Sequence, residues 1–159
     1  MGRAQVTYCK AQSGSHAGSH AASLKKRGLE AEPAGFYDHP SMVPIDLTPA
    51  KCSNSTCYPG TFQPPALEDC EVVIQAQLYN STGSLQASPG TWVFVSYGTC
   101  ATVFQNPEES SHTLQYNWAE LGAQAGKIAG SCMLDEHEYS TMGGACMFEK
   151  YLKYKFEGT

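Results

Sequence analysis

Seven cysteines in a chain of 159 residues constrain the fold more than any other feature of the sequence. Thiols at this density are unusual in a reducing cytosol, and an odd number does not suit a set of disulfides. The basic run Lys25, Lys26 and Arg27 explains the odd number, because proprotein convertases of the secretory pathway cut after exposed clusters of this kind. A cut there removes Cys9 with residues 1–27. The predicted disulfide cysteines are the six that follow: Cys52, Cys57, Cys70, Cys100, Cys132 and Cys146.

The composition changes at the same basic run. Residues 1–27 hold five of the ten basic residues and no acid, whereas all fifteen carboxylates follow Arg27. The near-repeat GSHAGSHAA could not bury a face, so we expect residues 1–27 to be a disordered leader or propeptide, cleaved after Arg27. The pair His16 and His20 lacks a third metal ligand and fits a linker better than a metal site. The alternative is that the basic run is a solvated charge cluster in a flexible leader.

The rest of the chain divides into an arm and one domain. Residues 28–65 carry most of the prolines and no sustained period, which predicts an extended Pro-rich arm pinned by Cys52 and Cys57. Residues 66–159 are expected to form a domain with a single hydrophobic core. No stretch approaches the roughly 18 apolar residues that span a membrane, so we expect no transmembrane segment.

Two helices are expected in the domain. The segment 66–79 follows two prolines and has acids in its first turns, as helix starts do. Its apolar stripe consists of Leu67, Cys70, Ile74 and Leu78. The segment 116–132 repeats apolar residues at intervals of three and four: Trp118, Leu121, Ala125, Ile128 and Cys132. Glycines at positions 122, 126 and 130 cost about 1 kcal/mol each in a helix, so we expect close packing of this helix onto the sheet to offset them.

The strand signals complete an α+β pattern. Residues 91–105 predict an antiparallel hairpin that turns at Gly98-Thr99, with strands covered on both faces. Residues 143–156 predict a last strand, with Gly143-Gly144 at its turn and lysines guarding an edge. The expected fold is therefore an antiparallel sheet with two helices packed on one face, stapled by disulfides. Of the fifteen possible pairings, we expect two bridges to tie helices to the sheet and the third to tie the arm.

Two triplets match the acceptor sequence for N-glycosylation. Asn54-Ser55-Thr56 and Asn80-Ser81-Thr82 each lie in a stretch that is typical of a loop. Such triplets are common by chance. Together with the cysteines they favour an oxidising destination outside the cytoplasm, and we expect glycans on Asn54 and Asn80.

The residues that carry catalysis in hydrolases do not form a recognisable constellation in this sequence. No serine lies in a Gly-x-Ser-x-Gly elbow, so a Ser-His-Asp hydrolase has no support. We expect no catalytic residue, no metal and no cofactor; the acidic run 135–138 has no cysteine or histidine partner at ligand spacing. A glycosidase with a carboxylate pair remains the alternative. Its candidates are Glu68, Asp69, Glu108, Glu109, Asp135, Glu136 and Glu138.

Charge and aromatic content limit the classes of molecule that the protein is expected to bind. After Arg27 the chain has five lysines, no arginine and fifteen carboxylates, a net charge of −10 that would repel a nucleic acid. Five aromatic residues could form a platform for sugars, but their spacing favours core positions. They are Trp92, Phe94, Tyr97, Phe104 and Trp118.

Five short motifs occur in an order that resembles a known family. They are Cys52 to Thr56, Asp69-Cys70, Gly90-Thr91-Trp92, Gly98-Thr99-Cys100 and Cys132. Between residues 50 and 146 the chain resembles fungal secreted cysteine-rich effectors of the necrosis-inducing type, which are distantly similar to killer toxins of the α/β-sandwich type. The resemblance implies a small exported protein that acts on other cells or hosts without enzymatic residues. The spacing from Cys100 to Cys132, the additional Cys57 and the Pro-rich arm depart from that family's pattern.

The sequence therefore predicts a secreted effector or toxin-like protein that binds a target outside the producing cell or in a host. The target would be a protein or cell-surface component of a host or competitor. We expect a role in virulence, a propeptide that is removed, and a glycoprotein. The competing classes are a small extracellular hydrolase and a cytosolic protein with free thiols.

Overall fold

The computed structural model describes residues 1–11, 43–59, 63–134 and 141–148. They form two α-helices, one π-helical turn and eight strands. In chain order these are β1 (Gln5–Lys10), β2 (Ile45–Asp46), β3 (Cys52–Pro59), α1 (Leu67–Leu78), β4 (Ser84–Ala87), β5 (Thr91–Tyr97), β6 (Cys100–Asn106), β7 (Leu114–Asn117), α2 (Trp118–Ala129), η1 (Gly130–Leu134) and β8 (Thr141–Phe148). The α+β class is confirmed, with the strands shared among three sheets in the orders β1-β5-β6, β2-β7-β4 and β3-β8.

The predicted hairpin is the centre of the first sheet. β5 and β6 pair antiparallel from Thr91↔Asn106 to Tyr97↔Cys100, and Gly98 turns the chain with a φ of +53°, which glycine adopts at no steric cost. Coverage on both faces was expected, and this is wrong for part of the hairpin. The two β5 valines, Val93 and Val95, are buried, whereas Trp92 is 38% exposed, because the two faces of the strand alternate between core and solvent.

The third strand of this sheet corrects the expectation for the leader. Residues Gln5–Lys10, expected to be disordered, form β1 and pair antiparallel with all of β5 except Tyr97. Ala4 is buried in the core, and the Arg3 guanidinium lies 5.3 Å from the centre of the Tyr97 ring. The segment QVTYC contains β-branched and aromatic residues that suit a strand, and it pairs with the free edge of β5. Composition alone does not reveal that such an edge exists. The processing residues Lys25, Lys26 and Arg27 lie outside the described residues.

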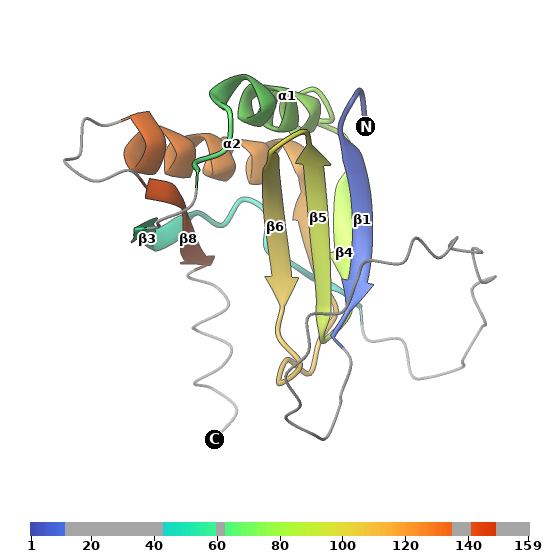
Figure 1. Ribbon diagram of the computed structural model, residues 1–159. Helices are drawn as coiled ribbons and strands as arrows, with labels where there is room; N and C mark the ends of the chain where they lie inside the picture. Colours follow the sequence, from blue (N-terminus) through green and yellow to red (C-terminus); the bar gives the residue numbers. More distant parts are fainter. Residues whose placement is uncertain (12–42, 60–62, 135–140, 149–159) are drawn as a thin grey trace, which may run out of the picture.

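The second sheet packs its inner face against the first. The short strands β4 and β7 pair antiparallel, and β2 adds a parallel edge to β7. Figure 1 shows β4 behind β5 and β1. One core unites both sheets, with Val93, Val95 and Phe104 from the first and Leu85, Leu114 and Tyr116 from the second. Tyr116 donates its hydroxyl hydrogen to the Ala50 carbonyl oxygen at 2.8 Å, which holds the arm against this core.

The first helix begins where predicted but buries a different stripe. Cys70, Val73 and Gln77 are its buried residues, while Leu67 is 49% exposed and Leu78 is 38% exposed. Gln77 is buried because its amide donates to the Val73 carbonyl oxygen at 3.1 Å and to the Thr102 hydroxyl at 3.3 Å. An apolar pattern alone misses a buried amide of this kind, whose Nε2 is paired while its Oε1 has no hydrogen-bond partner among the described residues.

The second helix packs along the first, and the two lie side by side across one end of the strands (Figure 1). Asn117 caps α2 by accepting from the backbone N–H groups of Ala119 and Glu120. A Cβ at Gly122 would lie 2.9 Å from the Gln77 Cβ and 3.1 Å from the Ile74 carbonyl oxygen. Close packing therefore explains Gly122, but the surface it meets is α1 and not the sheet.

The arm is part of the fold in its described residues. It supplies β2 to the second sheet and β3 to the third, where β3 pairs antiparallel with β8. β8 begins at Thr141, so Gly143 and Gly144 lie inside this strand and not at a turn before it. A Cβ at Gly144 would meet the Thr56 carbonyl oxygen at 2.7 Å, which explains a glycine in a strand interior. Among the described residues no helix is long and apolar enough to cross a membrane.

Candidate functional site

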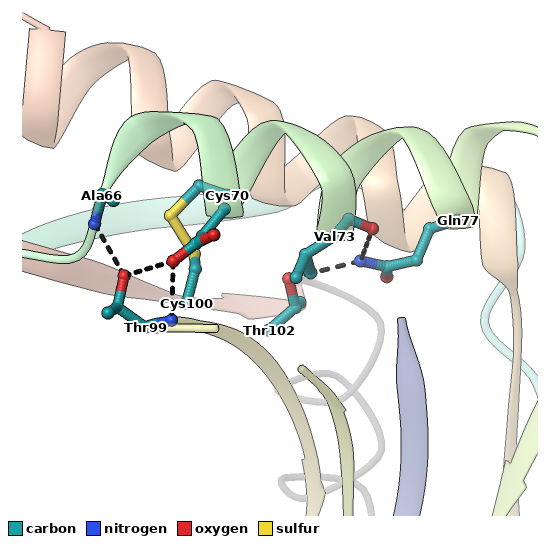
Figure 2. Close-up of a disulfide and its surroundings, with 8 residues drawn as sticks. Ala66, Cys70, Val73, Gln77, Thr99, Cys100 and Thr102 are labelled. Atoms are coloured by element: carbon teal, nitrogen blue, oxygen red, sulfur yellow. Dashed lines mark hydrogen bonds between the residues drawn. A yellow bond between two sulfur atoms is a disulfide. The ribbon is translucent and has the colours of Figure 1, made fainter. Parts of the chain in front are cut away.

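The Cys70–Cys100 disulfide joins the start of α1 to the turn between β5 and β6, and hydrogen bonds reinforce it (Figure 2). The Asp69 carboxylate accepts from both the backbone N–H and the hydroxyl of Thr99, each at 2.8 Å. The Thr99 hydroxyl in turn accepts from the backbone N–H of Ala66 at 2.8 Å. A Cβ at Gly98 would overlap the Asp69 carboxylate. We call this assembly of Ala66, Asp69, Cys70 and Gly98–Cys100 the staple.

The staple alters the acidity of Asp69. The backbone N–H of Thr99, followed by its hydroxyl, lowers the pKa of Asp69 below the ordinary value of 3.8, because both groups donate to the ionised carboxylate. Asp69 is therefore ionised at neutral pH and holds the hairpin turn on the helix.

The other two disulfides fix β3. Cys57 is bonded to Cys132 in the π-helical turn, and Cys52 is bonded to Cys146 in β8. All six cysteines that follow Arg27 are thus paired, and Cys9 carries a free, exposed thiol. Two bridges tie the arm and one ties a helix to the sheet, the reverse of the expected division. The arm contributes β3, which two disulfides fix to the rest of the fold. The spacing of the cysteines in the sequence did not reveal this strand.

A cavity of about 1010 Å³ lies between β6 and β8, and we call it the groove. Every residue from Thr99 to Gln105 and from Met142 to Phe148 lines it. The staple contributes Ala66 and Cys70 to its wall. Further walls come from β3, α1, α2 and the Pro64-Pro65 segment before α1; apolar side chains such as Ile74, Leu121 and Ile128 predominate.

The groove runs along the edges of two strands. The groove touches seven consecutive residues along each strand, so it reaches their backbone and not only the side chains of one face. Among the described residues β6 pairs only with β5, and β8 pairs only with β3. Figure 1 shows β6 and β8 running in the same direction, with the two helices above them. Backbone N–H and C=O groups on both facing edges are therefore available to a further strand.

Large exposed apolar side chains gather around the groove. Tyr58, Trp92, Val103, Met142 and Met147 line it and are each between 37% and 52% exposed. Trp92 also stacks on Phe94, with ring centres 6.3 Å apart. Of the five aromatic residues singled out from the sequence, Phe104 and Trp118 are buried core residues, as expected, whereas Trp92 is a surface residue.

The predicted glycosylation sites differ in their surroundings. Asn54 is exposed and lies within β3, at an irregularity where its φ is +52°, and not in a loop. Asn80 follows the C-terminus of α1 in a turn and is half-buried. Glycosylation of either asparagine stays a prediction.

The candidate carboxylates of the hydrolase alternative are spread over the fold. Glu68 and Asp69 lie on α1 beside the start of β6, whereas Glu108 and Glu109 follow its end. The seven residues of β6 span about 23 Å at 3.3 Å per residue, which exceeds the separation of roughly 5–9.5 Å that glycosidases use. Asp135, Glu136 and Glu138 lie outside the described residues. In the part of the chain that the structure describes, no three histidine, cysteine, aspartate or glutamate side chains form a metal site.

Sequence reasoning named Thr99 only as a turn and motif residue and missed its contact with Asp69; it also missed the β8 methionines. The motifs Asp69-Cys70 and Gly98-Thr99-Cys100 contain the signal for the staple, because a carboxylate and a hydroxyl flank the two cysteines. For Met142 and Met147 there was no signal, because their role depends on where β8 lies relative to β6.

No protein-family model, no curated protein and no solved structure matches this chain. The functional argument therefore rests on the staple, the groove and its rim.

Proposed function

We infer that this protein is a secreted, disulfide-rich effector or toxin-like protein that acts by binding a target outside the producing cell or in a host. One observation carries this inference: exposed apolar side chains surround a groove whose walls are cross-linked by disulfides. Apolar surface of this kind marks interaction sites on proteins that are otherwise polar outside. A rigid rim also reduces the entropy lost on binding.

The chemistry of the chain supports a destination outside the cell. Three disulfides persist in oxidising surroundings, and Asn54 and Asn80 offer glycan acceptors. The basic run before Gly28 offers a site for removal of a propeptide. Two motifs that carry the resemblance to fungal necrosis-inducing and killer-toxin-like effectors, Asp69-Cys70 and Gly98-Thr99-Cys100, meet in the staple. A role in virulence or competition follows from that resemblance.

The groove favours a protein or cell-surface target over a nucleic acid. The net charge, −10 after Arg27 and −5 with residues 1–27 included, repels polyanions, while the rim offers aromatic and thioether groups. Met142 and Met147 are adaptable side chains, which suits a surface that recognises an apolar partner.

The test compares two surface variants of the natively secreted protein. Trp92→Ser combined with Met147→Ser removes apolar surface from the rim, whereas Tyr79→Ser removes an 86% exposed tyrosine at the end of α1, outside the groove lining. Labelled protein is applied to a panel of fungal and plant cells, and binding is measured by flow cytometry. We expect saturable binding to one cell type, weakened about tenfold or more by the rim variant and unchanged by the control.

Enzymatic activity would give a different result. If the secreted protein hydrolyses a glycan, and one carboxylate-to-amide substitution such as Glu108→Gln abolishes that activity, the hydrolase alternative is correct. A folded rim variant that binds cells as well as the unsubstituted protein would also contradict the proposal.

A further inference from the structure

The two facing strand edges of the groove are the starting point of a second inference. A chain segment placed between β6 and β8 could pair with both, because paired strands lie about 4.8 Å apart. Recognition by strand addition obtains its affinity from backbone hydrogen bonds and its specificity from pockets for alternate side chains. The apolar lining of the groove supplies such pockets on one side of the added strand.

The chain itself leaves β8 at the groove. Phe148, the last residue of β8, packs its ring 5.7 Å from the ring centre of Phe104 in β6 and 4.8 Å from that of Tyr116. Residues 149–159 follow and lie outside the described residues. A hairpin turn takes about two to five residues, so at least six remain for a strand of about 20 Å. That length nearly matches the seven residues of β6.

The sequence of residues 149–159 alternates as a strand does. Leu152, Tyr154 and Phe156 occupy one parity, and Lys153 and Lys155 occupy the other. In an extended conformation the first set forms an apolar face and the second a basic face. The apolar face fits the lining of the groove, and the lysines on the opposite face would point to solvent, as they do on exposed strands.

We propose that residues 149–159, the tail, bind in the groove of their own molecule as a strand between β6 and β8. A hairpin makes the tail antiparallel to β8, and because β6 runs in the same direction as β8, the tail is antiparallel to both (Figure 1). One sheet then extends in the order β1-β5-β6-tail-β8-β3. The tether to Phe148 favours the tail over a free peptide, since short linkers give effective concentrations of about millimolar.

Two matched triple variants of the full chain test the docking. Leu152→Ser, Tyr154→Ser and Phe156→Ser remove the apolar face, and Tyr151→Ser, Lys153→Ser and Lys155→Ser remove the other face. Amide hydrogen exchange is followed in β6 and β8 by mass spectrometry. We expect the first variant to exchange about tenfold faster or more in both strands, with β1 unchanged, and the second variant to match the unsubstituted protein.

A second measurement reports the rim directly. Trp92 lines the groove and Trp118 is buried, so quenching of tryptophan fluorescence by acrylamide should increase in the apolar-face variant. The increase should vanish when Trp92→Phe is added. A synthetic peptide of residues 149–159, added to the apolar-face variant, should restore slow exchange, and a shuffled peptide should not.

Three results would overturn the proposal. Equal exchange in all three proteins would mean that the tail is not bound, and equal acceleration by both triple variants would mean that the tail has no preferred face. Protection that requires a dimer, detected by light scattering, would assign the groove to a second copy. If the unsubstituted protein binds no cell type while its tail still slows amide exchange in β6 and β8, only the proposed function is refuted.

Discussion

At the scale of single residues, the molecule depends on a few polar groups placed next to cysteines. Asp69 and Thr99 bring the hairpin turn and the helix together through charge-assisted hydrogen bonds, beside the Cys70–Cys100 bond. Gly98 permits this because it combines a positive φ with the absence of a Cβ. Asp69, Gly98 and Thr99 lie outside the hydrophobic core, whereas Cys70 is buried and Cys100 packs against the core cluster, so polar contacts add to core packing in positioning one wall of the groove.

The staple predicts a dependence of stability on pH. The pKa of Asp69 is lower in the folded protein than its ordinary value of 3.8, so the ionised carboxylate stabilises the fold above pH 3.8 and this contribution is lost as the pH falls through the folded-state pKa. Asp69→Asn should therefore lower the melting temperature at pH 7, and the difference from the unsubstituted protein should shrink as the pH falls below 3.8.

Differential scanning calorimetry between pH 2 and pH 7 would measure this effect. Glu68→Gln is the matched control, because Glu68 is the neighbouring carboxylate on α1 and makes no hydrogen bond with the described residues. A difference that is the same at every pH would show that the charge of Asp69 is not what stabilises the turn.

At the scale of elements, the helices and the hairpin follow from the sequence, and their packing does not. Periodicity placed both helices correctly, and glycine with β-branched residues placed β5 and β6. It could not show that Gln77 is buried or that Gly122 meets α1, because both depend on which surfaces meet. The groove was equally out of reach, since it arises where β6 and β8, 35 residues apart between Asn106 and Thr141, lie opposite each other.

Two glycines of α2 give a matched prediction. Gly122→Ala should lower the free energy of unfolding by about 1–2 kcal/mol, because its Cβ would collide with α1 and this outweighs the gain in helix propensity. Gly126→Ala should raise it by about 0.5–1 kcal/mol, because the nearest atom, Ile74 Cγ2, is 3.8 Å from the new Cβ.

Urea unfolding followed by circular dichroism would measure both variants. If both stabilise the protein equally, the close contact between α1 and α2 is absent in solution. Gly130, with no atom within 4 Å of a Cβ, lies in the π-helical turn and is not part of the comparison.

At the scale of the whole molecule, the α+β fold class and the number of disulfides were predictable from the sequence. The residues at which the folded part begins were not. Counting cysteines after Arg27 gave the six that are paired. Composition misjudged Gln5–Lys10 because a strand needs only a few alternating residues and a vacant edge on β5. Composition also predicted an extended arm for residues 28–65, because it does not reveal that β3 pairs with β8. β3 carries two of the disulfides.

The place of β1 predicts what cleavage after Arg27 would do. Residues 1–27 should remain bound to the rest of the protein, because β1 pairs with six residues of β5 and Ala4 is buried. Native mass spectrometry of the cleaved protein should detect a complex of the two fragments, which separates under denaturing conditions. Replacing Val6 and Tyr8 with proline removes backbone donors of β1 and should release the fragment without denaturant. Release of the unsubstituted fragment in native buffer would contradict the pairing.

The connectivity of the bridges has a consequence for a nicked chain. Cys52 and Cys57 lie on one side of the central sequence, and Cys146 and Cys132 lie on the other. Hydrolysis of any single peptide bond between Cys57 and Cys132 therefore leaves two fragments that are still joined by at least two sulfur–sulfur links. Digestive enzymes of a host or competitor would have to cut this region repeatedly before any piece could diffuse away.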